Sequence, residues 1–366
     1  METEKSPRLL SLDAYRGLVM FALATGGLGL AKVAGRLPDN EFLQFLKFHV
    51  SHPEWNSQFK MVGFALWDMI QPAFMFMVGV SMPYSYEKRQ KLGHSFGKQL
   101  SHAWIRAILL ILLGVFLQSR GKSETFWIFT NVLSQIGLGY GFLFFLVGKA
   151  VRTQVIVGLV ILVGYFLLML PRGFENGYSM PQLFDLWFLN LFPRAKVFEG
   201  HSYATLNFVP AFVTMLMGLM CGQLLKNDNF SAMEKLRRLA SAGAVCLVAG
   251  LLFATVCPIV KKLWTPSWTL FSGAYVIWLL AIMYWVIDLK GWKRWTFFFV
   301  VVGLNPLAMY FMGMQMKAWT LGIFKTHLPD ILFAGTWGPF VSGLMIALFF
   351  WLILWWMYRN RVFIRI

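Results

Sequence analysis

A series of apolar stretches, each about 17 to 25 residues long, runs through this chain from end to end, and each is long enough to cross a bilayer as a helix. Only helices and closed barrels satisfy their backbone hydrogen bonds inside lipid, and a barrel would show alternating strands of about ten residues. These stretches are continuous, so we predict one all-α, polytopic domain over residues 1–366 with about ten transmembrane helices. The predicted spans are 12–31, 62–83, 103–119, 128–147, 154–170, 205–225, 240–258, 270–287, 296–316 and 335–357.

Composition supports the membrane class. Charged residues make up only 13% of the chain and hydrophobic residues 58%, whereas average soluble domains are about 25% charged. This excludes an ordinary soluble enzyme, a disordered chain and a nucleic-acid-binding protein, and makes the lipid bilayer the expected surrounding. With a cytoplasmic N-terminus, 20 of the 33 Lys and Arg residues fall in inner segments and 13 in outer ones. The positive-inside rule therefore predicts that both termini are cytoplasmic.

Neither the cysteines nor the N-terminal segment predicts a metal site or a cleaved signal peptide. Cys221, Cys246 and Cys257 lie in apolar runs and are interpreted as small hydrophobic residues, and no Cys/His cluster predicts a metal. The triplet 22–24 (ALA) resembles a signal-peptidase site, but Asp13 and Arg16 interrupt the apolar run before it. The first predicted helix is therefore expected to remain in the mature protein.

Two polar residues near the second span are candidates for catalysis. Asp68 falls within an apolar run, where a carboxylate costs roughly 2.5–3.5 kcal/mol. It either clamps two helices together or orients a catalytic group. His52 precedes that span, and a histidine is well suited to accept a proton near neutral pH, although an isolated histidine is usually a surface group. His49 lies three residues before His52, but no third ligand is nearby, so we predict no metal.

Other polar and aromatic residues leave two interpretations open. Asp13 and Arg16 share one helix face and form either an ion pair or a contact to an anionic ligand. Asn207 and Asn305 lie in apolar runs, where amides either hold helices together or line a polar tunnel. Trp264 belongs either to an interfacial aromatic belt or to a surface that stacks on a sugar.

Several motifs occur in a characteristic order along the chain. They are RLLSLDAYRG (8–17), HPEWN (52–56), WDMIQPAFMFMVG (67–79), KLWTPSW (262–268), YWVIDLKG (284–291), GLNP (303–306) and YRNRVF (358–363). Together they resemble the membrane core of heparan-α-glucosaminide N-acetyltransferase and its bacterial relatives, over about residues 8 to 366.

This resemblance implies a function. Acetyl-CoA from the cytoplasm would be the acyl donor, and an amino sugar or other glycan on the outer face would be the acceptor. The residues that match the family's site, or that we assign to its chemistry, are His52 and Asp68 for catalysis, Asp13, Arg16, Asn207 and Asn305 for acetyl-CoA, and Trp55, Asn56, Lys262 and Trp264 for the acceptor. The family's lumenal N-terminal domain has no counterpart here, so we expect a multi-pass protein of the bacterial inner membrane, with a homodimer as an open alternative.

Two other functions remain open. The first is a solute transporter or flippase in which Asp68 and the buried amides bind the cargo. The second is a membrane scaffold whose polar residues only hold helices together. Stabilisation of the purified protein by acetyl-CoA or CoA would favour the enzyme over both.

Overall fold

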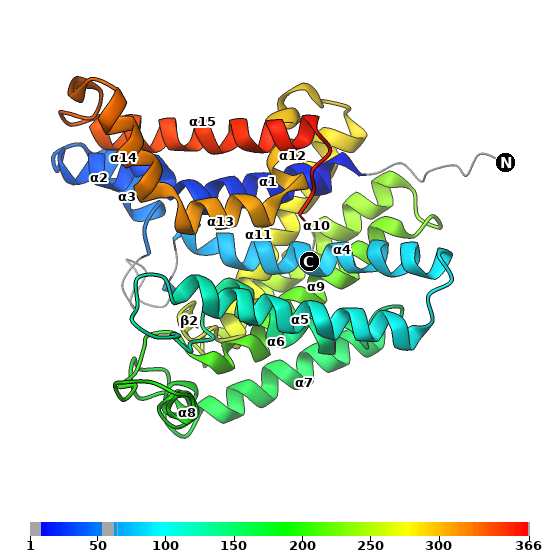
Figure 1. Ribbon diagram of the computed structural model, residues 1–366. Helices are drawn as coiled ribbons and strands as arrows, with labels where there is room; N and C mark the ends of the chain where they lie inside the picture. The colour runs from blue at the N-terminus through cyan, green and yellow to red at the C-terminus, as the bar shows by residue number, and fades with distance from the viewer. Residues whose placement is uncertain (1–8, 53–61, 64, 365–366) are drawn as a thin grey trace. The chain divides into compact units, whose positions relative to one another are not determined.

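The computed structural model describes residues 9–52, 62–63 and 65–364. Regular structure in these residues is almost entirely helical, from α1 (Leu10–Thr25) to α15 (Gly338–Arg359) (Figure 1). The prediction of an all-α protein is confirmed, and helical residues lie in each of the predicted apolar spans.

Within the described residues, six helices are long and apolar enough to cross a membrane. They are α5 (Phe96–Gln118), α7 (Val151–Met169), α9 (Phe208–Lys226) with the preceding 3-10 turn η4 (Thr205–Asn207), α10 (Ala232–Phe253), α11 (Pro266–Met283) with the π-turn η5 (Tyr284–Leu289), and α15. Two bent pairs bring the number to eight if each pair is one span. The chain is therefore a multi-pass membrane protein.

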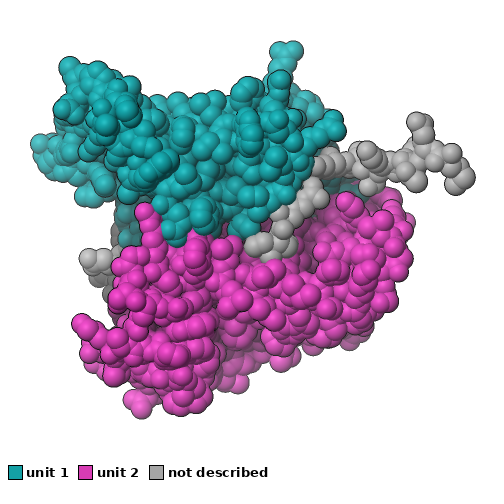
Figure 2. Space-filling view, viewed as in Figure 1, with its two compact units in different colours: residues 1–52, 232–240, 278–365 teal, residues 53–231, 241–277, 366 magenta. Residues whose placement is uncertain are grey.

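The described residues form two compact units, which Figure 2 colours separately. Of the described residues, 9–52, 232–240 and 278–364 belong to unit 1. Besides α1, α15 and parts of α10 and α11, its elements are η1 (Gly27–Gly29), α2 (Leu30–Gly35), α3 (Glu41–His49), η5, η6 (Arg294–Thr296), α12 (Phe297–Leu304), α13 (Pro306–Gln315), α14 (Lys317–His327) and η7 (Asp330–Leu332). Helices α1 and α12 pack backbone to backbone, because a Cβ added at Gly17 would overlap the carbonyl oxygen of Phe299.

Of the described residues, 62–63, 65–231 and 241–277 belong to unit 2. Besides α5, η4, α7, α9 and the remaining parts of α10 and α11, its elements are β1 (Val62–Gly63), η2 (Leu66–Met69), α4 (Ile70–Lys91), α6 (Val132–Phe144), α8 (Met180–Phe188), η3 (Leu189–Leu191) and β2 (Ile259–Val260). Its core is the α4–α9 pair, where a Cβ at Gly79 would overlap the carbonyl of Met215 and one at Gly218 would overlap that of Phe76. Such small residues let membrane helices approach closely.

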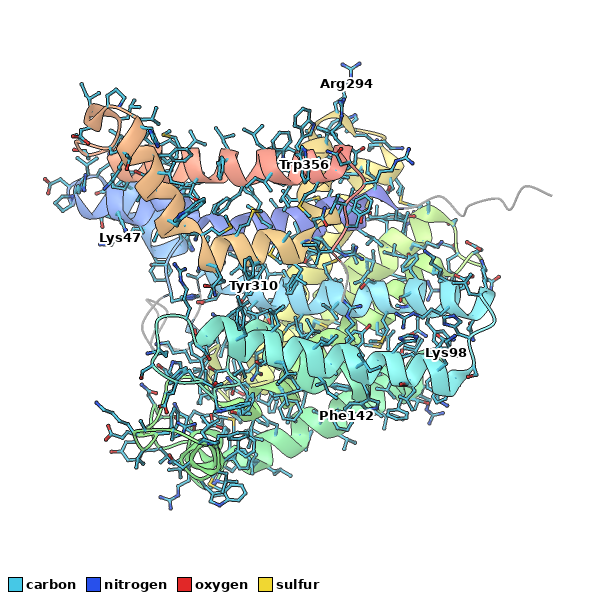
Figure 3. The ribbon with its side chains drawn as sticks, viewed as in Figure 1. Lys47, Lys98, Phe142, Arg294, Tyr310 and Trp356 are labelled. Atoms are coloured by element: carbon cyan, nitrogen blue, oxygen red, sulfur yellow. The ribbon has the colours of Figure 1, made fainter. Side chains whose placement is uncertain are left out.

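The outside of the helices suits a lipid environment. Apolar side chains such as Phe142 are exposed, and Lys98 lies in the first turn of α5 (Figure 3). In water, exposed apolar surface of this extent would be unfavourable, whereas in a bilayer it contacts acyl chains. Lysines near helix ends extend toward the headgroup region.

The second predicted span, 62–83, requires a correction. Val62–Gly63 pairs in parallel with Ile259–Val260, η2 follows, and α4 begins only at Ile70. Asp68 therefore precedes the helix instead of lying inside it. Its Oδ2 accepts a hydrogen bond from the backbone N–H of Ala65 at 3.0 Å, so the carboxylate satisfies a donor at the start of the helical segment.

Two long segments between predicted spans, which the predicted orientation places on the outer side, also contain helices. The segment 32–61 holds the end of α2 and all of α3, and the segment 171–204 holds α8. The predicted span 296–316 is bent by 73° between α12 and α13. The bend lies at Asn305, which begins α13 as its N-terminal cap residue and is followed by Pro306.

Candidate functional site

A buried charged cluster lies at the end of unit 2 that carries α8 and β2 (Figure 1). Lys261 Nζ lies 3.1 Å from Asp68 Oδ1, with side chains only 6% and 2% exposed. The same ammonium donates a hydrogen bond to the hydroxyl of Tyr203 at 3.3 Å. We call Asp68, Lys261 and Tyr203 the Asp68 cluster. Because burying one of these charges without the other is strongly unfavourable, the pair acts as one structural unit.

The loop that carries Lys261 is locked by the hydroxyl of Thr265. This hydroxyl donates to the carbonyl of Pro258 at 2.8 Å and accepts from the N–H groups of Val260 at 3.1 Å and Trp268 at 3.3 Å. Trp264 takes a left-handed conformation with φ of 48° and is 1% exposed. A bulky residue adopts that conformation only when its surroundings impose it, so the loop holds Lys261 in a defined position.

Asn207 and Tyr165 attach this loop to the helices. Asn207 Nδ2 donates to the carbonyl of Lys262 at 2.8 Å. The Tyr165 hydroxyl lies 3.2 Å from the carbonyl of Leu263 and 3.3 Å from Asn207 Oδ1, and it donates its single hydrogen to one or the other. Asn207 thus ties the start of α9 to the Lys261 loop, and Tyr165 places α7 beside both.

Asp185 on α8 forms a second buried polar group in unit 2. Its Oδ2 accepts from the N–H of Thr205 at 2.8 Å, and Gln135 Nε2 donates to the carbonyl of Thr205 at 3.0 Å. Burial raises the pKa of Asp185 to about 6. Within the described residues, Asp185 Oδ1, Thr205 Oγ1 and Gln135 Oε1 are buried without a hydrogen-bond partner.

The structure brings together the predicted site residues of unit 2 around the loop 257–268. Asp68 pairs with this loop through Lys261. Asn207 contacts it through the carbonyl of Lys262, and the ring of Trp264 is buried within it. Lys261, Tyr203 and Asp185 were not identified from the sequence. Lys261 and Lys262 are adjacent and of one type, so the sequence favours neither. Asp185 lies in the apolar run 183–189 (LFDLWFL), and a carboxylate in such a run was a signal that could have identified it.

The predicted residues of unit 1 have separate surroundings. Arg16 lies 3.4 Å from Asp13 Oδ1, and their side chains are 26% and 5% exposed. Asn305 donates to the carbonyl of Val362 and accepts from the N–H of Ile364, both at 2.9 Å, so its amide binds the C-terminal segment. His52 is exposed at the end of the described range 9–52.

Trp55 and Asn56 lie outside the described residues. In the part of the chain that is described, no group of three or more His, Cys, Asp or Glu residues is arranged to hold a metal ion.

The fold and its polar cluster define a multi-pass helical membrane protein with charged residues buried at one end of a helical unit. The catalytic family of heparan-alpha-glucosaminide N-acetyltransferase matches residues 39–254, more than half of the chain, and the protein belongs to this family. The matched region contains His52, Asp68 and Asn207. No curated protein matches the sequence. The resemblance of the sequence motifs to this transferase family is thereby confirmed.

Proposed function

We propose that this protein is a membrane acyltransferase that moves an acetyl group from cytoplasmic acetyl-CoA to an amino sugar or another glycan on the outer face. Membership of the N-acetyltransferase family supports the class of reaction. The proposal includes a bacterial inner-membrane location, about ten spans and cytoplasmic termini, with 20 of the 33 basic residues on the inner side.

The chemistry that we propose centres on His52. Its imidazole accepts a proton from the acceptor amine while the amine nitrogen attacks the thioester carbonyl carbon. The C–S bond then breaks, and the proton passes from His52 to the departing thiolate. In the covalent variant, a His52 nitrogen attacks the thioester carbonyl carbon, the C–S bond breaks, and CoA leaves as the thiol with the proton of the imidazole. The amine then attacks the acetyl-imidazole carbonyl, the C–N bond to His52 breaks, and the amine proton returns to the imidazole. Both routes require the same side chain.

The Asp68 cluster has a positioning role in this proposal. The observation that supports it most directly is the 3.1 Å pair between Asp68 and Lys261, which is almost fully buried. The carboxylate fixes the ammonium, and Lys261 with Tyr203 presents donors to a polar acceptor or to oxygen that gains negative charge during transfer. The orientation of His52 by Asp68 remains part of the proposal. So do contacts of Asp13, Arg16, Asn207 and Asn305 with acetyl-CoA, and of Trp55, Asn56, Lys262 and Trp264 with the acceptor.

Acetyl transfer from labelled acetyl-CoA to glucosamine, measured with the purified protein in lipid nanodiscs, tests the proposal. Loss of a general base typically costs about 10²–10⁴-fold, so His52→Ala should be nearly inactive while its thermal stability stays unchanged. His49→Ala is the matched control and should keep most of the activity. If both variants are as active as the wild type, the acyltransferase proposal is wrong.

A transporter or flippase is the alternative that one observation favours. The pairs Leu10–Thr25 with Gly27–Gly35 and Arg294–Leu304 with Pro306–Gln315 are bent by 50° and 73°. Transporters often build solute sites from such discontinuous helices. Movement of glucosamine into sealed proteoliposomes without acetylated product would favour this alternative, whereas acetylated product without net uptake would favour the enzyme.

A further inference from the structure

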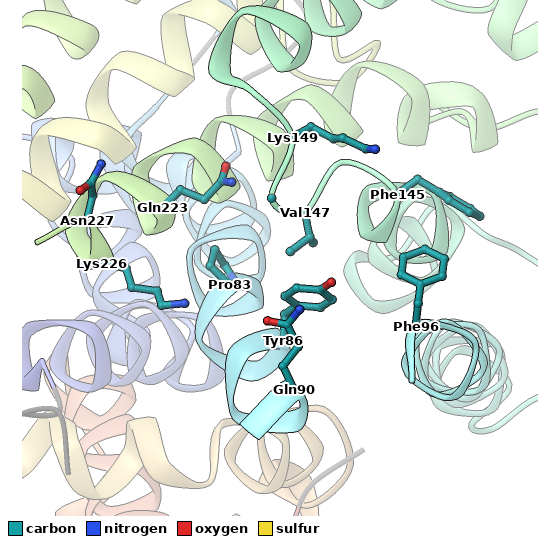
Figure 4. Close-up of a pocket in the computed structure, with 11 residues that line it drawn as sticks. Pro83, Tyr86, Gln90, Phe96, Phe145, Val147, Lys149, Gln223, Lys226 and Asn227 are labelled. Atoms are coloured by element: carbon teal, nitrogen blue, oxygen red, sulfur yellow. The ribbon is translucent and has the colours of Figure 1, made fainter. Parts of the chain in front are cut away.

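Unit 2 also contains a cavity of about 970 Å³, and Figure 4 shows residues that line it. It is formed where α4, α6 and α9 end and where α5 begins. Its volume falls within the range of small-molecule sites, about 300–1,000 Å³. Its lining includes two lysines (Lys149 and Lys226), three aromatic residues (Tyr86, Phe96 and Phe145) and the amide of Gln223.

The charge around this cavity is positive. Lys226 lies 2.7 Å from Glu87, which also pairs with Lys91 at 3.0 Å. Lys149 is exposed and takes part in no ion pair within the described residues. Of the two lysines that line the cavity, Lys226 is paired with a carboxylate and Lys149 is not. This excess of positive charge favours an anionic ligand.

The backbone beside Lys149 adds donors. Helix α7 starts at Val151, and the cap residue Ala150 contributes no side-chain hydrogen bond. The first N–H groups of a helix have no partner within the helix, and its dipole favours negative charge at this end. A phosphate near Lys149 would use both the ammonium and these N–H groups.

Polar and aromatic side chains suit the rest of such a ligand. Gln223 Oε1 accepts a hydrogen bond from the buried Gln154 at 2.7 Å, which leaves its amide NH₂ group as a donor on the cavity wall. Tyr86 and Phe96 both pack against Phe144, and their ring centroids lie 5.7 and 5.5 Å from that of Phe144, respectively. Held rings of this kind provide flat surfaces on which a planar heterocycle can stack.

We propose that this cavity binds the nucleotide part of the acyl donor, with its phosphates at Lys149 and Lys226 and its base against the aromatic rings. The identity of the donor as a CoA thioester rests on the proposed function, but the recognition of a phosphorylated nucleotide does not. The lining segments belong to loops whose basic residues predict the cytoplasmic side. From Ile70 to Tyr86 the rise along α4 is about 24 Å, so the cavity and the Asp68 cluster are separated by most of the hydrocarbon thickness of a membrane.

The test is calorimetric titration of ADP into the full-length protein in phosphatidylcholine nanodiscs. Lys149→Glu should weaken ADP binding by at least about tenfold, because it reverses a charge next to the phosphates. Phe145→Ala should weaken ADP but leave inorganic pyrophosphate unchanged. Lys196→Glu, at an exposed lysine far along the chain, is the matched control and should bind ADP like the wild type.

Several results would overturn the inference. Equal ADP affinity in Lys149→Glu and the wild type is one. Another is stabilisation of the wild type, but not of Lys149→Glu, by phosphatidylglycerol nanodiscs when ADP does not bind, which would indicate a lipid headgroup site. Acetyl transfer by Lys149→Glu with an unchanged KM for acetyl-CoA would overturn the inference and leave the proposed function standing. ADP binding that depends on Lys149, without any acetyl transfer, would support the nucleotide site and contradict the proposed function.

Discussion

Replacement of Lys261 by methionine tests the central physical claim about the Asp68 cluster. Methionine keeps most of the volume of lysine but removes its charge. At 3.1 Å, the attraction between Lys261 and Asp68 is about 5 kcal/mol for an effective dielectric constant of 20. Because both side chains are at most 6% exposed, loss of one partner leaves a buried carboxylate uncompensated. We therefore expect Lys261→Met to lower the free energy of unfolding by about 3–5 kcal/mol.

Asp68→Asn completes a double-mutant cycle. The asparagine keeps an oxygen that can accept from the N–H of Ala65, so this variant isolates the loss of charge. The double variant buries no unpaired charge, and its stability should recover at least half of the loss seen in Lys261→Met. The free energy of unfolding is measured in mixed micelles as the fraction of sodium dodecyl sulfate rises.

Glu87→Gln is the matched control for this cycle. Glu87 is 34% exposed and pairs with Lys91, which is 71% exposed, and with Lys226. Such solvent-accessible ion pairs contribute about 0–1 kcal/mol. The buried pair is not coupled as described if Lys261→Met lowers the free energy of unfolding no more than Glu87→Gln does. The same conclusion follows if the effects of Lys261→Met and Asp68→Asn on the free energy of unfolding simply add in the double variant.

Three further predictions follow from other parts of the chain. Burial raises the pKa of Asp185 from 3.8 to about 6, so the folded state holds the carboxyl proton more tightly than the unfolded state. The contribution of this proton to the free energy of unfolding is full below pH 3.8 and is lost as the pH rises through about 6. Asp185→Asn should therefore make the free energy of unfolding less dependent on pH in that window. Gly218→Ala should cost about 1–3 kcal/mol because its methyl group would overlap the α4 backbone, whereas Gly164→Ala on α7, with no atom within 4 Å, should be neutral or slightly stabilising in the same unfolding assay. In a protein without its native cysteines, a membrane-impermeant maleimide applied to intact cells should label Lys196→Cys but not Asn229→Cys, and the reverse pattern would contradict the predicted orientation.

The helical class and the approximate positions of the spans were determined by the sequence alone. The predicted spans 103–119 and 335–357 correspond to the helices Phe96–Gln118 and Gly338–Arg359. This succeeds because a segment in lipid must satisfy its hydrogen bonds within itself, so a long apolar run specifies a helix without reference to the rest of the chain.

Helix boundaries depended on contacts that sequence does not reveal. The run 62–83 appears continuous, yet its beginning pairs with Ile259–Val260, far along the chain. Hydropathy alone does not distinguish an apolar residue in a short strand pair from one in a helix. Asp68, which lies in η2 just before α4, was therefore assigned to the interior of a helix.

The site shows the same division between local and tertiary information. Asp68 and Asn207 were identifiable because a polar side chain within an apolar run requires a partner. The partners were decided only by the tertiary structure. Lys261 and Lys262 are chemically equivalent in the sequence, and only the folded structure shows that Lys261 is the one that pairs with Asp68. A charge acquires its partner through the packing of segments distant in the chain, and this packing is a property of the folded molecule as a whole.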